Sequence, residues 1–191
     1  MRSLILILFI ALLQSCVPDC KKVYFKETDK AWFSNIEDGD KLIFKSQYDD
    51  FDTIYITKKI VKEPIGDCKV FVNNNFIAEF VRIDYKMKKD SFDLVEDYLI
   101  QIAADEKSRD ATPVIRLLNM EYSNFAHKPL KTKPSELNSK WKSVYTFNKT
   151  NCPYTNLNGK FGLTEFEWDK NYGLVTYKNE KGESWMLIKK E

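Results

Sequence analysis

The strongest constraint on the fold is a series of short runs in which apolar and polar residues alternate, with turn-forming residues between them. Such alternation puts successive side chains on opposite faces of a strand, and short connections favour antiparallel neighbours. The sequence therefore predicts an all-β fold, an antiparallel barrel or strongly curled sheet of about eight to ten strands. One short helix is expected at 29–36. The expected strands are 41–46, 52–57, 68–72, 76–87, 92–104, 114–122, 141–148, 160–168, 173–177 and 184–189.

The N-terminus has the form of an export signal. Arg2 supplies a positive charge, ten apolar residues follow over Leu4–Leu13, and Gln14-Ser15 leads to Cys16. Ten helical residues cover about 15 Å, half of a hydrocarbon core of about 30 Å, so this run is too short to span a membrane. The Leu13-Gln14-Ser15-Cys16 boundary resembles the bacterial lipobox. That resemblance implies cleavage before Cys16 by signal peptidase II and lipid attachment at Cys16.

These boundaries divide the chain into three expected parts. Residues 1–15 are the signal peptide, 16–27 the lipid-attachment and tether segment, and 28–191 a single β-rich domain. Removing the leader leaves 176 residues (191 minus 15), enough to bury a core. Cleavage by ordinary signal peptidase is the alternative, and it would leave all four cysteines available for disulfides.

The three cysteines other than Cys16 allow one disulfide within the chain if Cys16 carries lipid. An exported protein meets conditions in which such a bond persists. Sequence spacing leaves the pairing open. Cys20 with Cys68 is the favoured pair, because it would fix the N-terminal segment to the domain, and Cys152 is the alternative partner.

Charge argues against nucleic acid as a partner. The formal net charge is only +2, and the basic residues are interspersed with acidic ones. Nucleic-acid binding requires a concentrated cationic face. No cysteine–histidine cluster of a zinc site and no glycine-rich phosphate loop is present in the sequence, so no cofactor is expected.

Few residues suggest catalysis. His127 is the only histidine, and we expect a structural role for it at the start of a proline-containing loop. Glu165, Glu167 and Asp169 alternate, which would set three carboxylates on one face of a strand, about 6.6 Å apart. A hydrolase using His127 or Glu165 and Glu167 is thus an alternative to an exposed acidic row. Asp49, Asp50 and Asp52 fit an Asx-type turn better than a calcium loop.

Aromatic residues are abundant, with 13 Phe, 10 Tyr and 4 Trp. Most are expected in the core, because sheet proteins of this size bury aromatic side chains on the inner face. Some could instead line a cavity for a hydrophobic ligand, as barrels of this size allow. The candidate pocket aromatics are Tyr98, Trp141, Trp168 and Trp185.

Two stretches resemble uncharacterised lipoproteins of Bacteroidetes-type bacteria. One runs from Trp32 through Asp52, carries Gly39-Asp40 before Leu42 and Phe44, and is followed by Ile54 and Ile56. The other is the C-terminal hairpin at 168–187, with Tyr172-Gly173, then Gly182 and Trp185-Met186-Leu187. Gly173 suits a close backbone approach and Gly182 a turn with positive φ. The resemblance implies a lipid-anchored, mostly antiparallel β protein of the envelope, and it carries no catalytic residues.

Together these features predict a non-enzymatic binding or scaffolding protein anchored by lipid in the cell envelope. The outer membrane is the expected location, with the leaflet left open. The expected partners are the membrane, through the anchor, and an unidentified envelope protein. A carrier of a hydrophobic small molecule or lipid is the other alternative.

Overall fold

A computed structural model gives the fold. It describes residues 20–65, 76–88, 94–107, 110–118, 120–123, 130–132, 141, 144–150, 152, 154–155 and 162–191. Cys16, Cys68 and His127 lie outside these residues, as do the expected strand at 68–72 and the signal peptide. The part described contains no helix that is long and apolar enough to cross a membrane.

Fourteen strands and one four-residue helix make up the regular structure of the described residues, which confirms the predicted all-β class. The helix is α2 (Glu27–Lys30). The strands are β1 (Lys21–Val23), β2 (Lys41–Ser46), β3 (Phe51–Lys62), β4 (Phe76–Ala78), β5 (Phe80–Lys88), β6 (Leu94–Ala103), β7 (Val114–Leu117), β8 (Met120–Tyr122), β9 (Leu130–Thr132), β10 (Val144–Asn148), β11 (Tyr154–Thr155), β12 (Leu163–Asp169), β13 (Gly173–Asn179) and β14 (Ser184–Lys190).

Twelve of these strands form one sheet, in the order β11-β8-β7-β6-β5-β3-β2-β14-β13-β12-β10-β9. All of its pairings are antiparallel. The C-terminal strand β14 pairs with β2, so the sheet joins the two ends of the domain. The C-terminal hairpin therefore completes the sheet, as the alternation over 173–189 predicts.

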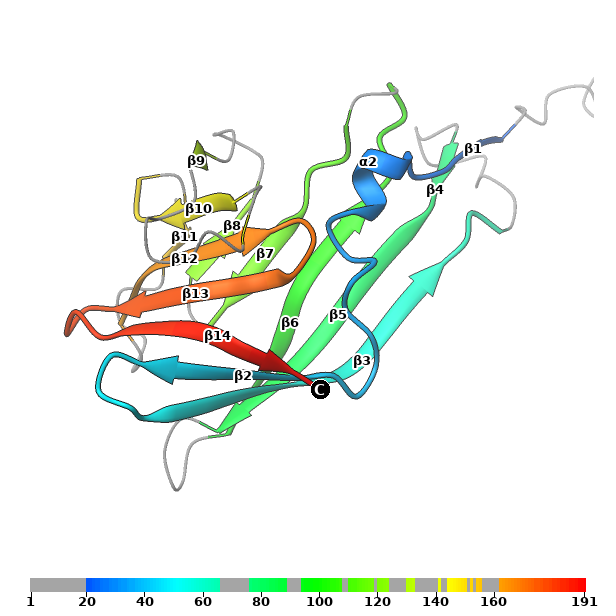
Figure 1. The fold of residues 1–191 in the computed structure, drawn as a ribbon. Coiled ribbons are helices and arrows are strands. Elements are labelled where there is room, and N and C mark those ends of the chain that lie inside the picture. Colours follow the sequence, from blue (N-terminus) through cyan, green and yellow to red (C-terminus); the bar gives the residue numbers. More distant parts are fainter. Residues whose placement is uncertain are drawn as a thin grey trace, which may run out of the picture.

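The sheet curls until its two ends nearly meet. Strands β2, β14, β13, β12 and β10 form a front layer that crosses β5, β6 and β7 behind it (Figure 1). The rings of Tyr122 on β8 and Phe147 on β10 lie 4.8 Å apart, centre to centre. This contact bridges the two ends of the strand order, which makes the molecule a nearly closed barrel.

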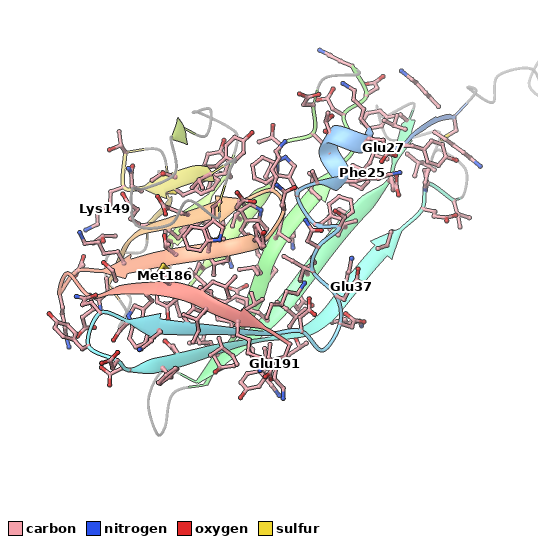
Figure 2. The ribbon with its side chains drawn as sticks, viewed as in Figure 1. Phe25, Glu27, Glu37, Lys149, Met186 and Glu191 are labelled. Carbon is pink, nitrogen blue, oxygen red and sulfur yellow. The ribbon has the colours of Figure 1, made fainter. Side chains whose placement is uncertain are left out.

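Large side chains fill the space between the two layers (Figure 2). Alternate residues of each strand point inward, so both layers contribute rings to one core. Phe147 also stacks on Phe166, and Phe44 meets Tyr177 edge to face. The largest fully buried residues are Trp141, Trp168, Tyr85, Tyr122, Tyr177, Phe44, Phe147 and Phe166.

The segment after β1 covers one end of the barrel. Asp29 of α2 is buried and accepts hydrogen bonds from the backbone N–H groups of Lys26 and Ala111, at 3.1 and 2.8 Å. Trp32 lies against Tyr145 of β10, with ring centres 4.8 Å apart. The segment thus contacts both layers.

Two boundaries differ from expectation near this segment. The helix begins at Glu27 and ends at Lys30, and hydrogen-bonded turns take its place over 31–36. Among the described residues, the first strand is β1, which starts at Lys21 inside the expected tether of 16–27 and pairs with β4. Val23 and Phe25 are buried, which supplies the energetic reason for this earlier start.

Gly173 permits a close approach between the turn after β12 and the N-terminal segment. Its φ is +82°, and a Cβ placed there would lie 3.1 Å from Cδ1 of Ile36. The positive φ and the close contact both favour glycine at this position, which agrees with the close backbone approach predicted for Gly173. Gly182, in the β13–β14 turn, also has a positive φ, of +80°.

Candidate binding surface

The tryptophans predicted as pocket residues belong to the packed core. Trp141 and Trp168 are buried, and Trp168 has no exposed surface. Trp185 is half-buried and stacks on Tyr177 with ring centres 5.9 Å apart. These three rings therefore pack against other side chains of the barrel interior.

Tyr98 lies on the outer face of the sheet instead. Ile100 and Ile102 point inward from the same strand, and plain alternation would place Tyr98 beside them. A bulge in the β5–β6 pairing, at Ile83/Asp84, inserts an extra residue and reverses the faces. Tyr98 and the exposed Glu96 therefore face outward.

The alternating carboxylates differ in burial and in hydrogen-bond partners. Their strand, β12, pairs with β10 in unbroken register from Glu165 to Asp169. Glu165 and Glu167 are half-buried, and Glu167 accepts a hydrogen bond of 2.8 Å from the Thr176 hydroxyl. Asp169 is fully buried and accepts one of 2.7 Å from the backbone N–H of Asn171. The expected exposed acidic row is therefore wrong at Asp169, and a hydrolase role of Glu165 and Glu167 stays a prediction.

Asp49 and Asp52, which are close in the sequence, have different surroundings in the structure. Asp52 points into the barrel, where its carboxylate accepts a hydrogen bond of 2.6 Å from the Tyr177 hydroxyl. Asp49 forms an ion pair with Lys45 at 2.5 Å. Among the described residues, no group of three or more acidic, cysteine or histidine side chains is arranged to hold a metal ion.

The cysteines differ in state. Cys20 is disulfide-bonded, whereas Cys152 is a reduced thiol with no exposed surface. Cys152 is therefore not the disulfide partner. The Cys20–Cys68 pairing stays a prediction, because Cys68 lies outside the described part. Burial raises the pKa of Cys152 to about 12, so this thiol is protonated at neutral pH.

A row of aromatic rings, each with a cation over it, crosses the outer face of the sheet. We call it the cation–aromatic band. Along the strand order β2, β3, β5, β6 and β7, cations and rings occupy outward positions between buried neighbours. The distances from cation to ring centre lie between 4.5 and 5.9 Å. The pairs are Lys45 over Phe51, Lys86 over Tyr55, Arg82 over Tyr98, and Arg116 over Tyr98.

Tyr98 is the centre of the band. Two arginines flank its ring, and its hydroxyl donates a hydrogen bond of 2.8 Å to Glu121. Arg116 also pairs with Glu121 and, at 3.1 Å, with Asp97. This network holds an aromatic ring and two guanidinium groups in fixed positions on a half-exposed surface.

The charge states of Tyr98 and Arg116 in the band are fixed at neutral pH. Burial, together with the hydrogen bond to Glu121, raises the pKa of Tyr98 to about 12, so the phenol is neutral at physiological pH. Burial alone would lower the pKa of Arg116, but Glu121 and Asp97 raise it above its ordinary value. A neutral donor and permanent cations suit the binding of polar groups.

A hollow of about 190 Å³ lies at the other end of β5, beside β1 and α2. Its lining is charged and mixed in sign, and Lys21 donates a hydrogen bond of 3.1 Å to the Glu106 carbonyl. The lining residues are Lys21, Lys22, Val23, Tyr24, Lys26, Asp29, Asp105 and Glu106. Six of these eight residues are charged, whereas the lining of a site for a hydrophobic ligand is predominantly apolar.

Sequence reasoning missed the band because its members come from five strands, and neither register nor bulges are visible in the sequence. One signal was present. Glu96 breaks an otherwise apolar face at 92–102, and it lies on the part of β6 that the bulge at Leu99 turns outward. Comparison with known families, curated proteins and solved structures finds no match to this chain.

Proposed function

We propose that this protein is a lipid-anchored protein of the cell envelope whose β-barrel has a non-enzymatic binding role. The leader and Cys16 support the anchor. The cation–aromatic band is the observation that supports binding, because it presents tyrosine, phenylalanine and arginine side chains in fixed positions. Tyrosine and arginine are enriched where protein interfaces carry most of their binding energy.

The band favours a protein partner with a mixed polar surface. Its cations already have acidic neighbours, such as Asp84 for Arg82 at 2.5 Å and Asp97 for Arg116. A partner would therefore contact a surface on which charges of both signs alternate with rings. Such a surface fixes the orientation of the partner and gives little net attraction for either sign of charge. The carrier alternative has less support, since buried rings fill the described interior.

The anchor is tested by changing Cys16. In a bacterium that has signal peptidase II, Cys16→Ala should leave the precursor uncleaved, and globomycin should have the same effect on the unchanged protein. Several acyl chains anchor a protein stably, whereas one binds only marginally. Processed protein should therefore sediment with membranes and shift in mass by its lipids. Normal cleavage of the Cys16→Ala protein would contradict the proposal.

The binding role is tested by photo-crosslinking from the band in cells. A photoreactive residue in place of Tyr55, which is 37% exposed, should yield a cross-link to one discrete envelope protein. Phe51→Ser, a neighbouring change at an exposed site, should lower the yield of that product. The matched control carries the photoreactive residue at Lys178 on β13, outside the band. Equal products from both sites, or a yield unaffected by Phe51→Ser, would contradict a binding role for the band.

A further inference from the structure

The end of the barrel that carries β1 has a distinct surface, which we call the β1 end. Strand β1 pairs with β4, and the N–H of Glu79, just after β4, donates a hydrogen bond of 2.7 Å to the Val23 carbonyl. The next residue along the chain, Phe80, pairs with Lys62 at the end of β3. Strands β1, β4 and the tip of β3 thus gather at one end (Figure 1).

The β1 end exposes apolar side chains. Tyr24 is 60% exposed and Ile65 is 78% exposed, although Val23 and Phe25 on either side of Tyr24 are buried. Val61 near the tip of β3 is also exposed. Figure 2 shows Phe25 and Glu27 at this end, far from Lys149 at the opposite end of the barrel.

The chain between Cys16 and Cys20 sets the distance from this surface to a lipid on Cys16. Four residues in fully extended form reach at most about 14 Å. The headgroup layer of one leaflet occupies roughly 5 to 7 Å, which is half the difference between the whole bilayer and its hydrocarbon core. A lipid on Cys16 would thus keep Cys20 and the adjoining β1 close to the headgroups.

We propose that the β1 end rests on the bilayer that holds the Cys16 lipids, an inference that depends on the lipid anchor of the proposed function. Tyr24, Val61 and Ile65 enter the headgroup layer, where tyrosine is favoured because its ring is apolar and its hydroxyl is polar. Lys21, Lys22 and Lys62 surround them and extend toward lipid phosphates.

Because the β1 end carries charges of both signs, its apolar contacts and the short tether are what mainly orient it on the bilayer. Glu63, Glu106 and Asp110 accompany the lysines, so the surface is mixed in sign. Attraction to anionic lipid is therefore secondary, and neutral bilayers should support the same orientation.

The orientation places the other end of the barrel away from the membrane. Strand β3 has 12 residues, which span roughly 40 Å, and the β2–β3 turn with Tyr48 lies at its far end. Tyr48 is 67% exposed, close to the exposure of Tyr24. The two tyrosines therefore form a matched pair that differs in position along the barrel.

The experiment compares lipid contact at these two tyrosines in the full-length, lipidated protein. A photoreactive residue replaces Tyr24 in one variant and Tyr48 in the other, and each protein is reconstituted into phosphatidylcholine vesicles. After irradiation, mass spectrometry measures lipid adducts per protein. We expect a several-fold excess of adducts at position 24. A second measurement uses an amine reagent, which should label Lys22 less than Lys178 on the same vesicles.

The outcomes separate the two proposals. A membrane-bound protein with equal adducts at both positions, or with more at position 48, would overturn the β1-end orientation and leave the anchor intact. A protein that carries no lipid and does not sediment with membranes would overturn the anchor and this inference together. Because Tyr24 and Tyr48 are both exposed, neither substitution should change the melting temperature. An unchanged melting temperature confirms that each variant is folded.

Discussion

Tyr177 and Asp52 form a buried polar contact inside the barrel, with a distance of 2.6 Å between hydroxyl and carboxylate. Burial, followed by the nearby carboxylate, raises the pKa of Tyr177 above its ordinary value. Tyr177→Phe removes a donor from a buried charge, and such hydrogen bonds contribute about 1.5–3 kcal/mol. We expect a loss of that size in the free energy of unfolding, measured by urea denaturation. Tyr48→Phe, at an exposed site, is the control. Equal effects of the two changes would contradict this role.

Cys152 gives the barrel a dependence on alkaline pH. Burial raises the pKa of its thiol from 9.0 to about 12, so the folded state favours the protonated form. This contribution to stability is fully present below about pH 9 and is lost as the pH rises toward 12. The free energy of unfolding should therefore fall between pH 8 and pH 10.5, and it should fall less steeply for Cys152→Ala. Identical slopes for the two proteins would show that the thiol does not contribute.

At the residue scale, the alternation of apolar and polar residues predicted which side chains are buried, but it did not predict which side chains contact one another. Leu42 and Phe44 are buried as their alternation indicates, and Gly173 has the positive φ that its position favours. The partner of Asp52 is 125 residues away, so no local signal identifies it. Tyr98 faces outward because of one extra residue in a strand, which alternation alone does not reveal.

Among the elements, α2 depends on Asp29 more than on helix propensity, since four residues are too few for a stable helix alone. Asp29 caps its first turn and also holds the N–H of Ala111. Asp29→Ala removes the acceptor of the buried Ala111 N–H and should cost about 1–3 kcal/mol, measured by thermal unfolding. Glu27→Ala removes an exposed carboxylate that pairs with Lys30, and it should change stability by about 0.5 kcal/mol or less. A larger effect of Glu27→Ala than of Asp29→Ala would contradict this assignment.

Strands could be predicted wherever apolar and polar residues alternate clearly. The turns that connect the strands could not all be predicted in the same way. The expected single strand at 114–122 is two strands, β7 and β8, joined by a tight turn. Leu118 occupies that turn with a φ of +53°, which few side chains favour, and its N–H is held by the Tyr85 hydroxyl at 2.8 Å. The residues 114–122 carry apolar groups on both faces, which favours one strand, and Asn119 is the single turn-forming residue between them.

At the scale of the whole molecule, curling brings β8 and β10 together although they lie near opposite ends of the strand order. The class of fold follows from composition and alternation. The near closure does not, because it depends on twist and bulges accumulated over many pairings. Aromatic and aliphatic side chains from both layers fill the interior of the described residues. The proposed binding surface therefore lies on the outside, where several strands each contribute one or two side chains.

The meeting of the two sheet ends can be measured through Tyr122 and Phe147. Their rings lie 4.8 Å apart, edge to face, and both are buried. Aromatic pairs of this geometry are coupled by about 0.5–1.5 kcal/mol in double-mutant cycles. We expect a coupling of that size from unfolding of Tyr122→Leu, Phe147→Leu and the double variant. A cycle on Phe147 and Phe166, which stack between paired strands, serves as the reference. Coupling near zero for the first pair, with normal coupling for the reference, would mean that the barrel is open between β8 and β10 in solution.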